Sequence, residues 1–252
     1  MSWLVLQGVK DACGQRGRDP LPQVSALRST GSRNRTDLIM NQTVIDWPDP
    51  LCAAAFRGLE KLQKASDIGA NVALALQQAD VLGLLAEFDP VIAGTLPIAI
   101  NTEQSDIDIL CHAVDLSRFN DCVDSTFSSY PHYRRHQRAP TNHVGVASVV
   151  RFECAGGDCD GFEVEIFATD CPSTAQYGFI HMLAEARILS LLGPDFAKNV
   201  RALKRQNVKT EPAFAQLLRL SGDPYIGVAE LANMSMDEMT AFVNRKGLFV
   251  VG

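Results

Sequence analysis

The feature that most constrains this chain is a pair of aspartates on one alternating segment. In residues 106–110 (Asp-Ile-Asp-Ile-Leu), Asp106 and Asp108 share one face of an expected strand and the two isoleucines share the other. The Cα atoms of such a pair lie roughly 6–7 Å apart, so the carboxylates can converge on one divalent cation. Without a cation they would repel, and one would tend to stay protonated. Solvated aspartate pairs are common, so this pair needs support from its surroundings.

A glycine and a threonine precede the pair. Residues 91–93 are expected to form a short buried strand that ends at Gly94 and Thr95, twelve residues before Asp106. Glycine lets a phosphate approach the backbone, and the next turn can offer N–H donors beside the Thr95 hydroxyl. A plain strand-ending turn has the same composition. A site for phosphate and metal is indicated by the succession of these features along the chain. The buried strand comes first, then Gly94 and Thr95, then Ser105 and the two aspartates.

Two further segments are predicted to form strands of the same sheet. Residues 162–167 alternate, so Glu163 and Glu165 share one face and the apolar side chains share the other. Residues 144–152, after a segment rich in Tyr, His and Arg, are predicted to form another strand. The pattern indicates a small mixed sheet with one face packed on helices and the other facing a cleft.

Segments with helical spacing of apolar residues lie on both sides of these strands. Before them, helices are expected at about 51–64 and 72–85. After Pro172, helices are expected at 177–192, 196–206 and 212–220, and two more begin near 224 and 236. Thr210, Asp223 and Ser235 are the expected N-caps, the last in a capping box. The sequence therefore predicts an α+β fold, with a small mixed sheet flanked by helices and followed by a C-terminal helical subdomain.

The first 39 residues differ from the rest in composition. They contain six Lys or Arg residues and three Asp residues, whereas the whole chain has a net charge of −6. A segment rich in Gly, Arg, Ser and Pro without an apolar period is expected to be disordered or poorly packed. A basic RNA-binding arm is the alternative, and Met40 could mark an internal translation start. We expect three parts: an extension over 1–39, a catalytic core over 40–172 and a helical subdomain over 173–252.

The composition narrows the class of protein. With 46% hydrophobic residues in 252 positions, the chain can bury a sizeable core. Its net charge of −6 argues against a general nucleic-acid coat protein, which needs a basic surface. Seven cysteines without CxxC spacing fit free thiols in a reducing cytosol, so a cytoplasmic location is expected. Because no apolar run reaches the roughly 18 residues of a membrane span, no membrane partner is expected.

These motifs resemble the DNA-polymerase-beta-type nucleotidyltransferase superfamily. That superfamily carries a Gly-Ser or Gly-Thr turn, an Asp-x-Asp strand and a third acidic residue on a neighbouring strand. Here the third residue would be Glu165, with Glu163 as the substitute on the same face. The chain also resembles, more narrowly, an uncharacterised bacterial family described as a domain of unknown function. The segments that carry this narrower resemblance are 93–98, 105–109, 165–167, 181–182, 209–215 and 222–225.

The resemblance implies a transfer of a nucleoside monophosphate from a triphosphate to an acceptor, with release of pyrophosphate. Asp106 and Asp108 would hold Mg²⁺ or Mn²⁺, and Glu165 would complete a second metal site or help to deprotonate an acceptor hydroxyl. The residues expected to contact the nucleotide are Gly94, Thr95, Ser105, His181, Lys204 and Lys209. The acceptor is left open by the sequence, and the acidic balance disfavours RNA.

Two groups of basic residues have alternative interpretations. Arg201, Lys204, Arg205 and Lys209 could contact the triphosphate, or could form a solvated helix face. Residues 134–138 follow two tyrosines, Tyr130 and Tyr133, and could hold an RNA end or a nucleobase. A mobile surface loop is the alternative for that segment. His181 could contact a ribose or base, or could be a hydrogen-bonded helix histidine.

One departure from the superfamily pattern favours a different class of function. Many active relatives place Arg and Gly a few residues after the Gly-Ser pair, where this chain has Pro97, Ile98 and Ala99. The usual helix and triphosphate contact are therefore not expected here. Beside the transferase, two alternatives remain: a non-catalytic member that binds a nucleotide or a partner, and a metal-dependent phosphohydrolase that uses water as the acceptor.

Overall fold

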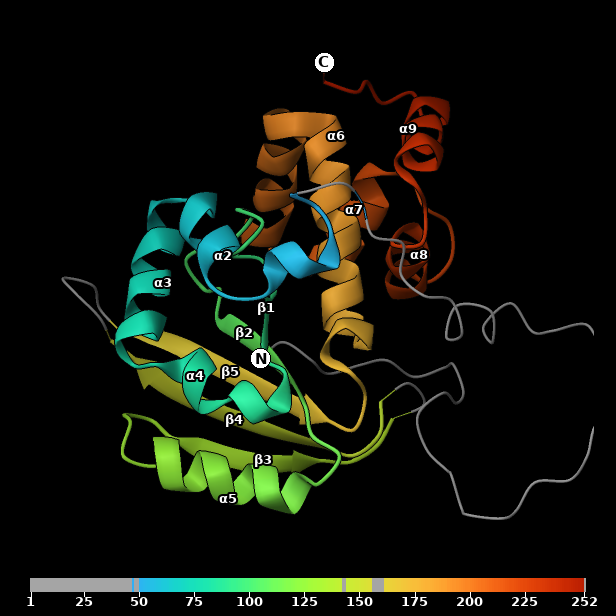
Figure 1. The fold of residues 1–252 in the computed structure, drawn as a ribbon. Helices are drawn as coiled ribbons and strands as arrows, with labels where there is room; N and C mark the ends of the chain where they lie inside the picture. Colours follow the sequence, from blue (N-terminus) through green and yellow to red (C-terminus); the bar gives the residue numbers. More distant parts are fainter. Residues whose placement is uncertain (1–46, 48–49, 142–143, 156–160, 252) are drawn as a thin grey trace, which may run out of the picture.

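The computed structural model describes residues 47, 50–141, 144–155 and 161–251 of the 252-residue chain. The predicted extension over 1–39 and Met40 lie outside these residues. In the described part, helices enclose a sheet on one side and form a separate bundle at the C-terminal end (Figure 1).

Five strands form one mixed sheet. They are β1 (Val91–Ala93), β2 (Ile107–His112), β3 (Arg134–Arg138), β4 (Ala147–Cys154) and β5 (Phe162–Thr169). Their order is β1-β2-β5-β4-β3. Only β2 and β5 are parallel, and the other three pairings are antiparallel. The predicted mixed sheet is confirmed.

Helices precede, interrupt and follow the sheet. Before and between the strands lie η1 (Ala53–Phe56), α2 (Glu60–Ala65), α3 (Asp67–Gln78), α4 (Val81–Leu84), η2 (Ala86–Phe88) and α5 (Leu116–Phe127). After the sheet come η3 (Ser173–Ala175), α6 (Tyr177–Arg205), α7 (Thr210–Leu217), α8 (Pro224–Leu231) and α9 (Met236–Arg245). The predicted α+β architecture with helices at the C-terminal end is confirmed.

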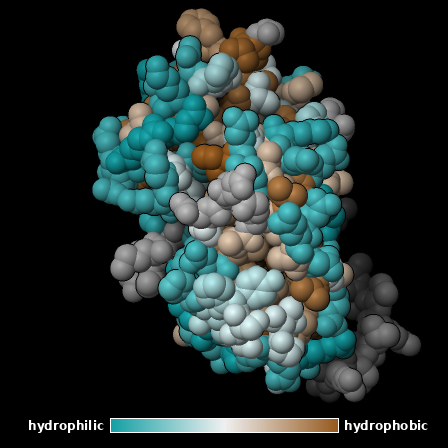
Figure 2. All heavy atoms as spheres, turned by 90° about the vertical axis from the view of Figure 1, so that its left-hand side faces the viewer, coloured by the Kyte–Doolittle hydropathy of each residue, from teal (hydrophilic) through white to brown (hydrophobic). Residues whose placement is uncertain are grey.

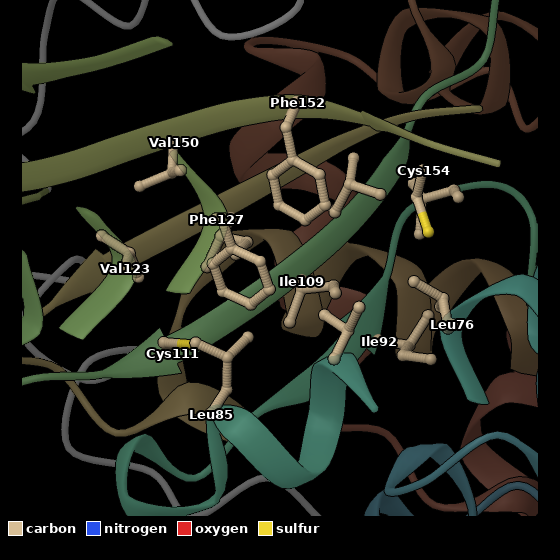
Figure 3. Packing of buried hydrophobic residues seen from close by; sticks show 14 of the residues in the cluster. Leu76, Leu85, Ile92, Ile109, Cys111, Val123, Phe127, Val150, Phe152 and Cys154 are labelled. Atoms are coloured by element: carbon tan, nitrogen blue, oxygen red, sulfur yellow. The ribbon is translucent and has the colours of Figure 1, made fainter. Parts of the chain in front are cut away.

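The main core lies between one face of the sheet and helices α3, α4 and α5. The alternation in β2 and β5 places Ile107, Ile109, Val164 and Ile166 on this face, where all are at most 1% exposed. Figure 3 shows Ile109 among side chains from β4, α5 and the segment around α4. Burial of branched apolar side chains at this density is the main source of stability for the sheet.

Helix α6 covers the opposite face at β1 and β2. Leu110 of β2 and Val91 of β1 pack there against Phe179, Met182 and other buried residues of α6. This face also carries Asp108, because residues 108 and 110 point to the same side of the strand. The arrangement places Asp108 where the sheet meets α6.

The C-terminal helices form a third apolar cluster with Trp47. Phe196 and Phe214 meet edge to face, with ring centroids 5.6 Å apart. The Trp47 indole donates a hydrogen bond to the Met234 carbonyl at 2.7 Å, and Arg187 lies over its ring. A residue N-terminal to all the described helices is therefore part of the C-terminal core.

Several element predictions need correction. Residues 134–138 form strand β3 instead of a loop, because an edge strand needs only backbone pairing with β4 and tolerates charged side chains. Tyr130 and Tyr133 pack against the main core and do not alternate with the arginines on the surface. The helix expected over 51–64 is interrupted at Gly58, which has a φ of 74°. Helix α5 was not predicted.

Two of the three predicted helix N-caps are confirmed. Asp223 accepts hydrogen bonds from two backbone N–H groups, and Ser235 forms the predicted capping box with Glu238. The expected N-cap at Thr210 is wrong, since Lys209 occupies that position and Thr210 is the first residue of α7. Helix α6 contains the predicted break at Gly193, whose φ of 70° and ψ of −166° are not helical.

The surface view in Figure 2 is mostly hydrophilic, with apolar residues in small separate groups. No helix in the described ranges combines the length and apolar character needed to cross a membrane. The cysteines at 52, 111, 122, 154 and 171 are free thiols, as predicted, and Cys13 and Cys159 lie outside the described residues.

Candidate nucleotide-binding cleft

A cleft of about 420 Å³ lies where the sheet meets the C-terminal helices. Eight of the nine residues predicted for the site line it, and Glu165 is the exception. The full lining is Gly94, Thr95, Thr102, Gln104, Ser105, Asp106, Asp108, Gly178, His181, Glu185, Lys204, Asn207, Val208, Lys209, Thr210, Glu211 and Tyr225. Residues up to 131 positions apart in the sequence are therefore brought into one cleft.

Gly94 ends β1 directly beside the Asp108 carboxylate. The antiparallel register pairs Ala93 with Asp108, so the next residue passes over the aspartate side chain. Gly94 has a φ of 78°, and a Cβ atom at this position would overlap the Asp108 carboxylate. Glycine is needed here both for its conformation and for space.

Ser105 connects the two sides of the 94–105 segment. Its hydroxyl oxygen accepts a hydrogen bond from the Thr95 hydroxyl at 3.2 Å and another from the Thr102 backbone N–H at 2.9 Å. These bonds fix the turn just before the two aspartates. Thr95 and Ser105 thus line the cleft and also hold its wall in place.

Residues 96–99, which include Pro97, form a turn closed by a hydrogen bond from the Ala99 N–H to the Leu96 carbonyl at 3.1 Å. The turn is held from α6, where Arg201 donates to the Ala99 carbonyl at 2.7 Å and Lys204 donates to the Ile100 carbonyl at 2.9 Å. Arg201 does not line the cleft, and Arg205 forms an exposed ion pair with Glu103 at 3.5 Å. Of the candidate cations on α6, only Lys204 is brought to the cleft.

Glu165 lies next to Asp108 on the neighbouring strand but is more deeply buried. The parallel register pairs these two residues, and the Glu165 side chain is 2% exposed and ion-paired with Arg151. Burial raises the pKa of Glu165; the Arg151 guanidinium opposes this rise, and the charge of Asp106 adds to it. Glu163, the predicted substitute, forms ion pairs with Arg134 at 2.7 Å and Arg151 at 3.4 Å.

Lys204 is half-buried and is the less exposed of the two lysines that line the cleft. Burial lowers the pKa of its ammonium to about 8, while Glu185, Asp108, Glu211 and Asp106 act in the opposite direction. The ammonium therefore remains mostly protonated at pH 7. An ammonium has three N–H donors, so Lys204 can hold the Ile100 carbonyl and also contact an anion in the cleft.

His181 connects α6 to helices α7 and α8. Its Nδ1 atom lies 3.1 Å from a Glu211 carboxylate oxygen, and its Nε2 atom lies 3.0 Å from the Tyr225 carbonyl oxygen. The contact with Glu211 is an ion-pair distance without good hydrogen-bond alignment. Burial by itself would raise the pKa of Glu211, but the contact with His181 lowers it below its usual value.

Glu185 and Glu211 are acidic cleft residues that the sequence did not single out as functional. Both lie in or beside segments of the resemblance, Glu185 one helical turn after His181 and Glu211 within 209–215. Burial, followed by the charge of Glu211, raises the pKa of Glu185 well above its usual value. The sequence signal for Glu185 was its helical spacing from His181, and the signal for Glu211 was its position within residues 209–215.

The carboxylate oxygens that line the cleft can supply some of the ligands that a hard divalent cation needs. Asp106 and Asp108 offer carboxylate oxygens, which Mg²⁺ and Mn²⁺ prefer. In the described ranges, no three His, Cys, Asp or Glu side chains already form a metal-ligand cluster. Glu165, committed to Arg151, would have to rotate toward the aspartates to become a third ligand.

A family comparison matches residues 74–231 to the domain of unknown function DUF4269. The chain belongs to the DUF4269 family. The matched region contains the whole sheet and every residue of the cleft, which locates the cleft within the defining part of this family. A comparison with curated proteins gives no match.

Solved structures similar to this DUF4269 chain include a poly(U) polymerase, the GLD-2/RNP-8 complex and a proposed nucleotidyltransferase. The Cid1 poly(U) polymerase with MgGTP bound has a TM-score of 0.44 at 12% identity, over 62% of this chain and 50% of that chain. The GLD-2/RNP-8 complex has a TM-score of 0.38 at 13% identity, over 63% of this chain and 57% of that chain. A proposed nucleotidyltransferase from H. pylori has a TM-score of 0.29 at 12% identity, over 68% and 93%. The chain thus spans about half the length of the first of these, and at these scores the likeness carries no argument about activity.

Proposed function

We propose that this DUF4269 protein is a metal-dependent nucleotidyltransferase that moves a nucleoside monophosphate from a triphosphate to an acceptor hydroxyl. One observation carries the proposal: the cleft places Asp106 and Asp108 together with Lys204 and Lys209. A triphosphate needs hard cation ligands and cationic side chains at the same time. The motif resemblance of the sequence points to the same chemistry.

Six residues that line the cleft have specific roles in this proposal. Asp106 and Asp108 would hold Mg²⁺ or Mn²⁺, which when bound supplies neutralisation of the charge on the triphosphate. Gly94 leaves the backbone open to a phosphate, and Lys204 donates to phosphate oxygens from the opposite side. His181 and Tyr225 also line the cleft and are the side chains proposed to contact a ribose or base.

The proposed reaction balances in one step. The acceptor hydroxyl oxygen forms a bond to the α-phosphorus while the bond to the β-phosphate oxygen breaks, and pyrophosphate leaves with the electron pair. The hydroxyl proton would pass to the Glu165 carboxylate after this side chain turns from Arg151 toward the aspartates, and its raised pKa would make it a better base. Arg151 holds that carboxylate on the face that carries Asp108.

The proposal is tested by incubating the purified protein with Mg²⁺ or Mn²⁺, α-labelled triphosphates and a low-molecular-mass cell extract. Label is expected on an acceptor, and the double variant Asp106→Ala/Asp108→Ala is expected to lower the transfer rate by at least about 100-fold. The control is Asp121→Ala, because Asp121 is an exposed residue on α5, away from the cleft. Free nucleoside monophosphate as the sole product would indicate the phosphohydrolase. No product, with triphosphate binding unchanged in the double variant, would refute the catalytic proposal.

A further inference from the structure

The sheet face that carries Asp108 continues beyond the cleft as an ordered row of charges. The strand registers align Asp108 of β2 with Glu165 of β5, Glu165 with Arg151 of β4, and Arg151 with Arg134 of β3. Directly paired residues point to the same side of a sheet. Side-chain exposure rises along the row, from 2% at Glu165 to 16% at Arg151 and 48% at Arg134. The row therefore begins with the Asp108 carboxylate in the cleft, continues with the buried Glu165 carboxylate, and ends with guanidiniums toward the edge strand β3.

Arg138 adds to this face a guanidinium that contacts an aromatic ring. It shares the face with Arg134 because the two residues are four positions apart on one strand. Its guanidinium lies over the Phe167 ring, 5.9 Å from the centroid, and Phe167 follows Glu165 by two residues on β5. Among the described residues, no ion pair includes Arg138, whereas Arg134 and Arg151 both pair with Glu163.

The ordinary explanation for arginines on β3 is protection of an edge strand from pairing with other chains. That explanation suits a side chain directed into solvent. Arg138 instead is half-buried and folds back over the sheet toward Glu165. A guanidinium that lies over an aromatic ring is attracted to the ring face, and its forked donors suit bidentate recognition of a phosphate group.

We propose that the face formed by Arg138, Phe167 and Arg151 binds the acceptor of the reaction, and that this acceptor is a small hydroxylated compound carrying one phosphate group. The identification as an acceptor rests on the proposed function, whereas the phosphate site itself does not. Phe167, over which the Arg138 guanidinium lies, is two residues from Glu165 on β5, so the Cα atoms of Phe167 and Glu165 are roughly 6–7 Å apart. A phosphate group at Arg138 and a hydroxyl group directed toward Glu165 can therefore belong to one small molecule, such as a phosphorylated sugar or polyol.

The observations favour a small acceptor over an RNA strand. A polyanion gains affinity by neutralising a series of phosphates with unpaired cations. Here two of the three arginines on the face are already paired with Glu163 or Glu165, and the whole chain has a net charge of −6. A single guanidinium such as that of Arg138 is suited to one phosphate.

Direct binding tests the site without any need for turnover. The full-length protein is titrated with glycerol 3-phosphate and ribose 5-phosphate, with glycerol and ribose as the unphosphorylated counterparts, and with a 5′-phosphorylated ten-nucleotide RNA. At least one of the two phosphorylated small compounds should bind, and its parent alcohol should not. Arg138→Gln should weaken that binding roughly tenfold or more, because a charge-assisted contact is lost. Arg118→Gln, which removes an exposed arginine of α5, should leave it unchanged.

A second variant and a measurement of label transfer complete the test. Arg138→Lys retains the charge but not the bidentate geometry, so intermediate affinity is expected, and thermal unfolding confirms that each variant is folded. Preference for the RNA over both small compounds, or equal binding by the Arg138→Gln variant, would overturn the inference. Label transfer is then measured with each compound as acceptor. Arg138-dependent binding without transfer would keep the phosphate site and overturn its role as the acceptor site, while the extract assay with the Asp106→Ala/Asp108→Ala variant separately decides the proposed function. Transfer that ignores both the phosphate and Arg138 would overturn this inference alone.

Discussion

At the scale of single residues, Gly94 is the position where the fold and the proposed chemistry depend on the same atoms. Its positive φ ends β1, and its missing side chain leaves the space that the Asp108 carboxylate occupies. Any side chain here would have to displace that carboxylate from the cleft or shift the end of the strand.

We therefore predict that Gly94→Ala destabilises the protein by about 2–4 kcal/mol, through both backbone strain and overlap with Asp108. The matched control is Gly58→Ala, because Gly58 has nearly the same φ, 74°, and a methyl group there would meet no atom within 4 Å among the described residues. That control should lose only about 1 kcal/mol. Urea unfolding followed by circular dichroism measures both values, and equal losses would show that the overlap is relieved without cost.

Glu185 is a residue whose charge costs stability. Burial and the nearby Glu211 raise its pKa, while Lys204 acts in the opposite direction. For a carboxyl group whose folded pKa is raised, the folded state binds more protons than the unfolded state, so stability is lost as the pH rises above about 4.5. The penalty grows until the pH passes the raised pKa in the folded protein.

Replacement of Glu185 by Gln removes this titration and keeps the shape of the side chain. We predict that Glu185→Gln is more stable than the natural protein at pH 8, by about 1–3 kcal/mol, and that the two converge below pH 5. Chemical unfolding across this pH range gives the comparison. A variant that is less stable at pH 8 would show that Glu185 forms a net favourable pair with Lys204.

At the scale of elements, the spacing of apolar residues and the N-cap residues of helices were sufficient to predict most of the strands and helices. The alternation around Asp106 and Glu165 predicted β2 and β5, and Asp223 and Ser235 marked the starts of α8 and α9. These signals are local, so they are present in the sequence before any tertiary contact forms.

The missed strand depends on tertiary contacts, whereas the missed helix α5 carries local signals, the N-cap Asp115 and the buried residues Phe119, Val123 and Phe127 at helical spacing. Strand β3 has no apolar alternation, and it exists because its backbone pairs with β4. The association of Glu165 with Arg151 requires a strand register that neither segment encodes alone. Similarly, Glu211 and Tyr225 reach the cleft only because α7 and α8 pack back onto α6.

At the scale of the whole molecule, the folded unit is larger than the region that defines the family. The family match begins at residue 74, yet Phe56 and Leu62 are each 1% exposed and Trp47 is 4% exposed. Phe56 meets Phe179 of α6 edge to face, with ring centroids 6.1 Å apart. The segment before residue 74 therefore supports the helix that covers β1 and β2.

We predict that Phe56→Ala destabilises the protein by about 3–5 kcal/mol, although it lies outside the matched region. Leu74→Ala is the control, because Leu74 lies at the start of that region and is 44% exposed. The control should change the unfolding free energy by less than about 1 kcal/mol. Denaturant unfolding distinguishes the two, and similar small effects would mean that η1 does not support α6.

The parallel pairing of β2 and β5 also has a consequence for how the protein is made. Asp108 and Glu165 are neighbours in the sheet but stand 57 positions apart in the chain, with α5, β3 and β4 between them. Closing a loop of this length is entropically costly and slows folding. A chain emerging from the ribosome therefore presents its two aspartates well before their partner strand exists, and the three carboxylates can first share one face only when β5 enters the middle of the sheet.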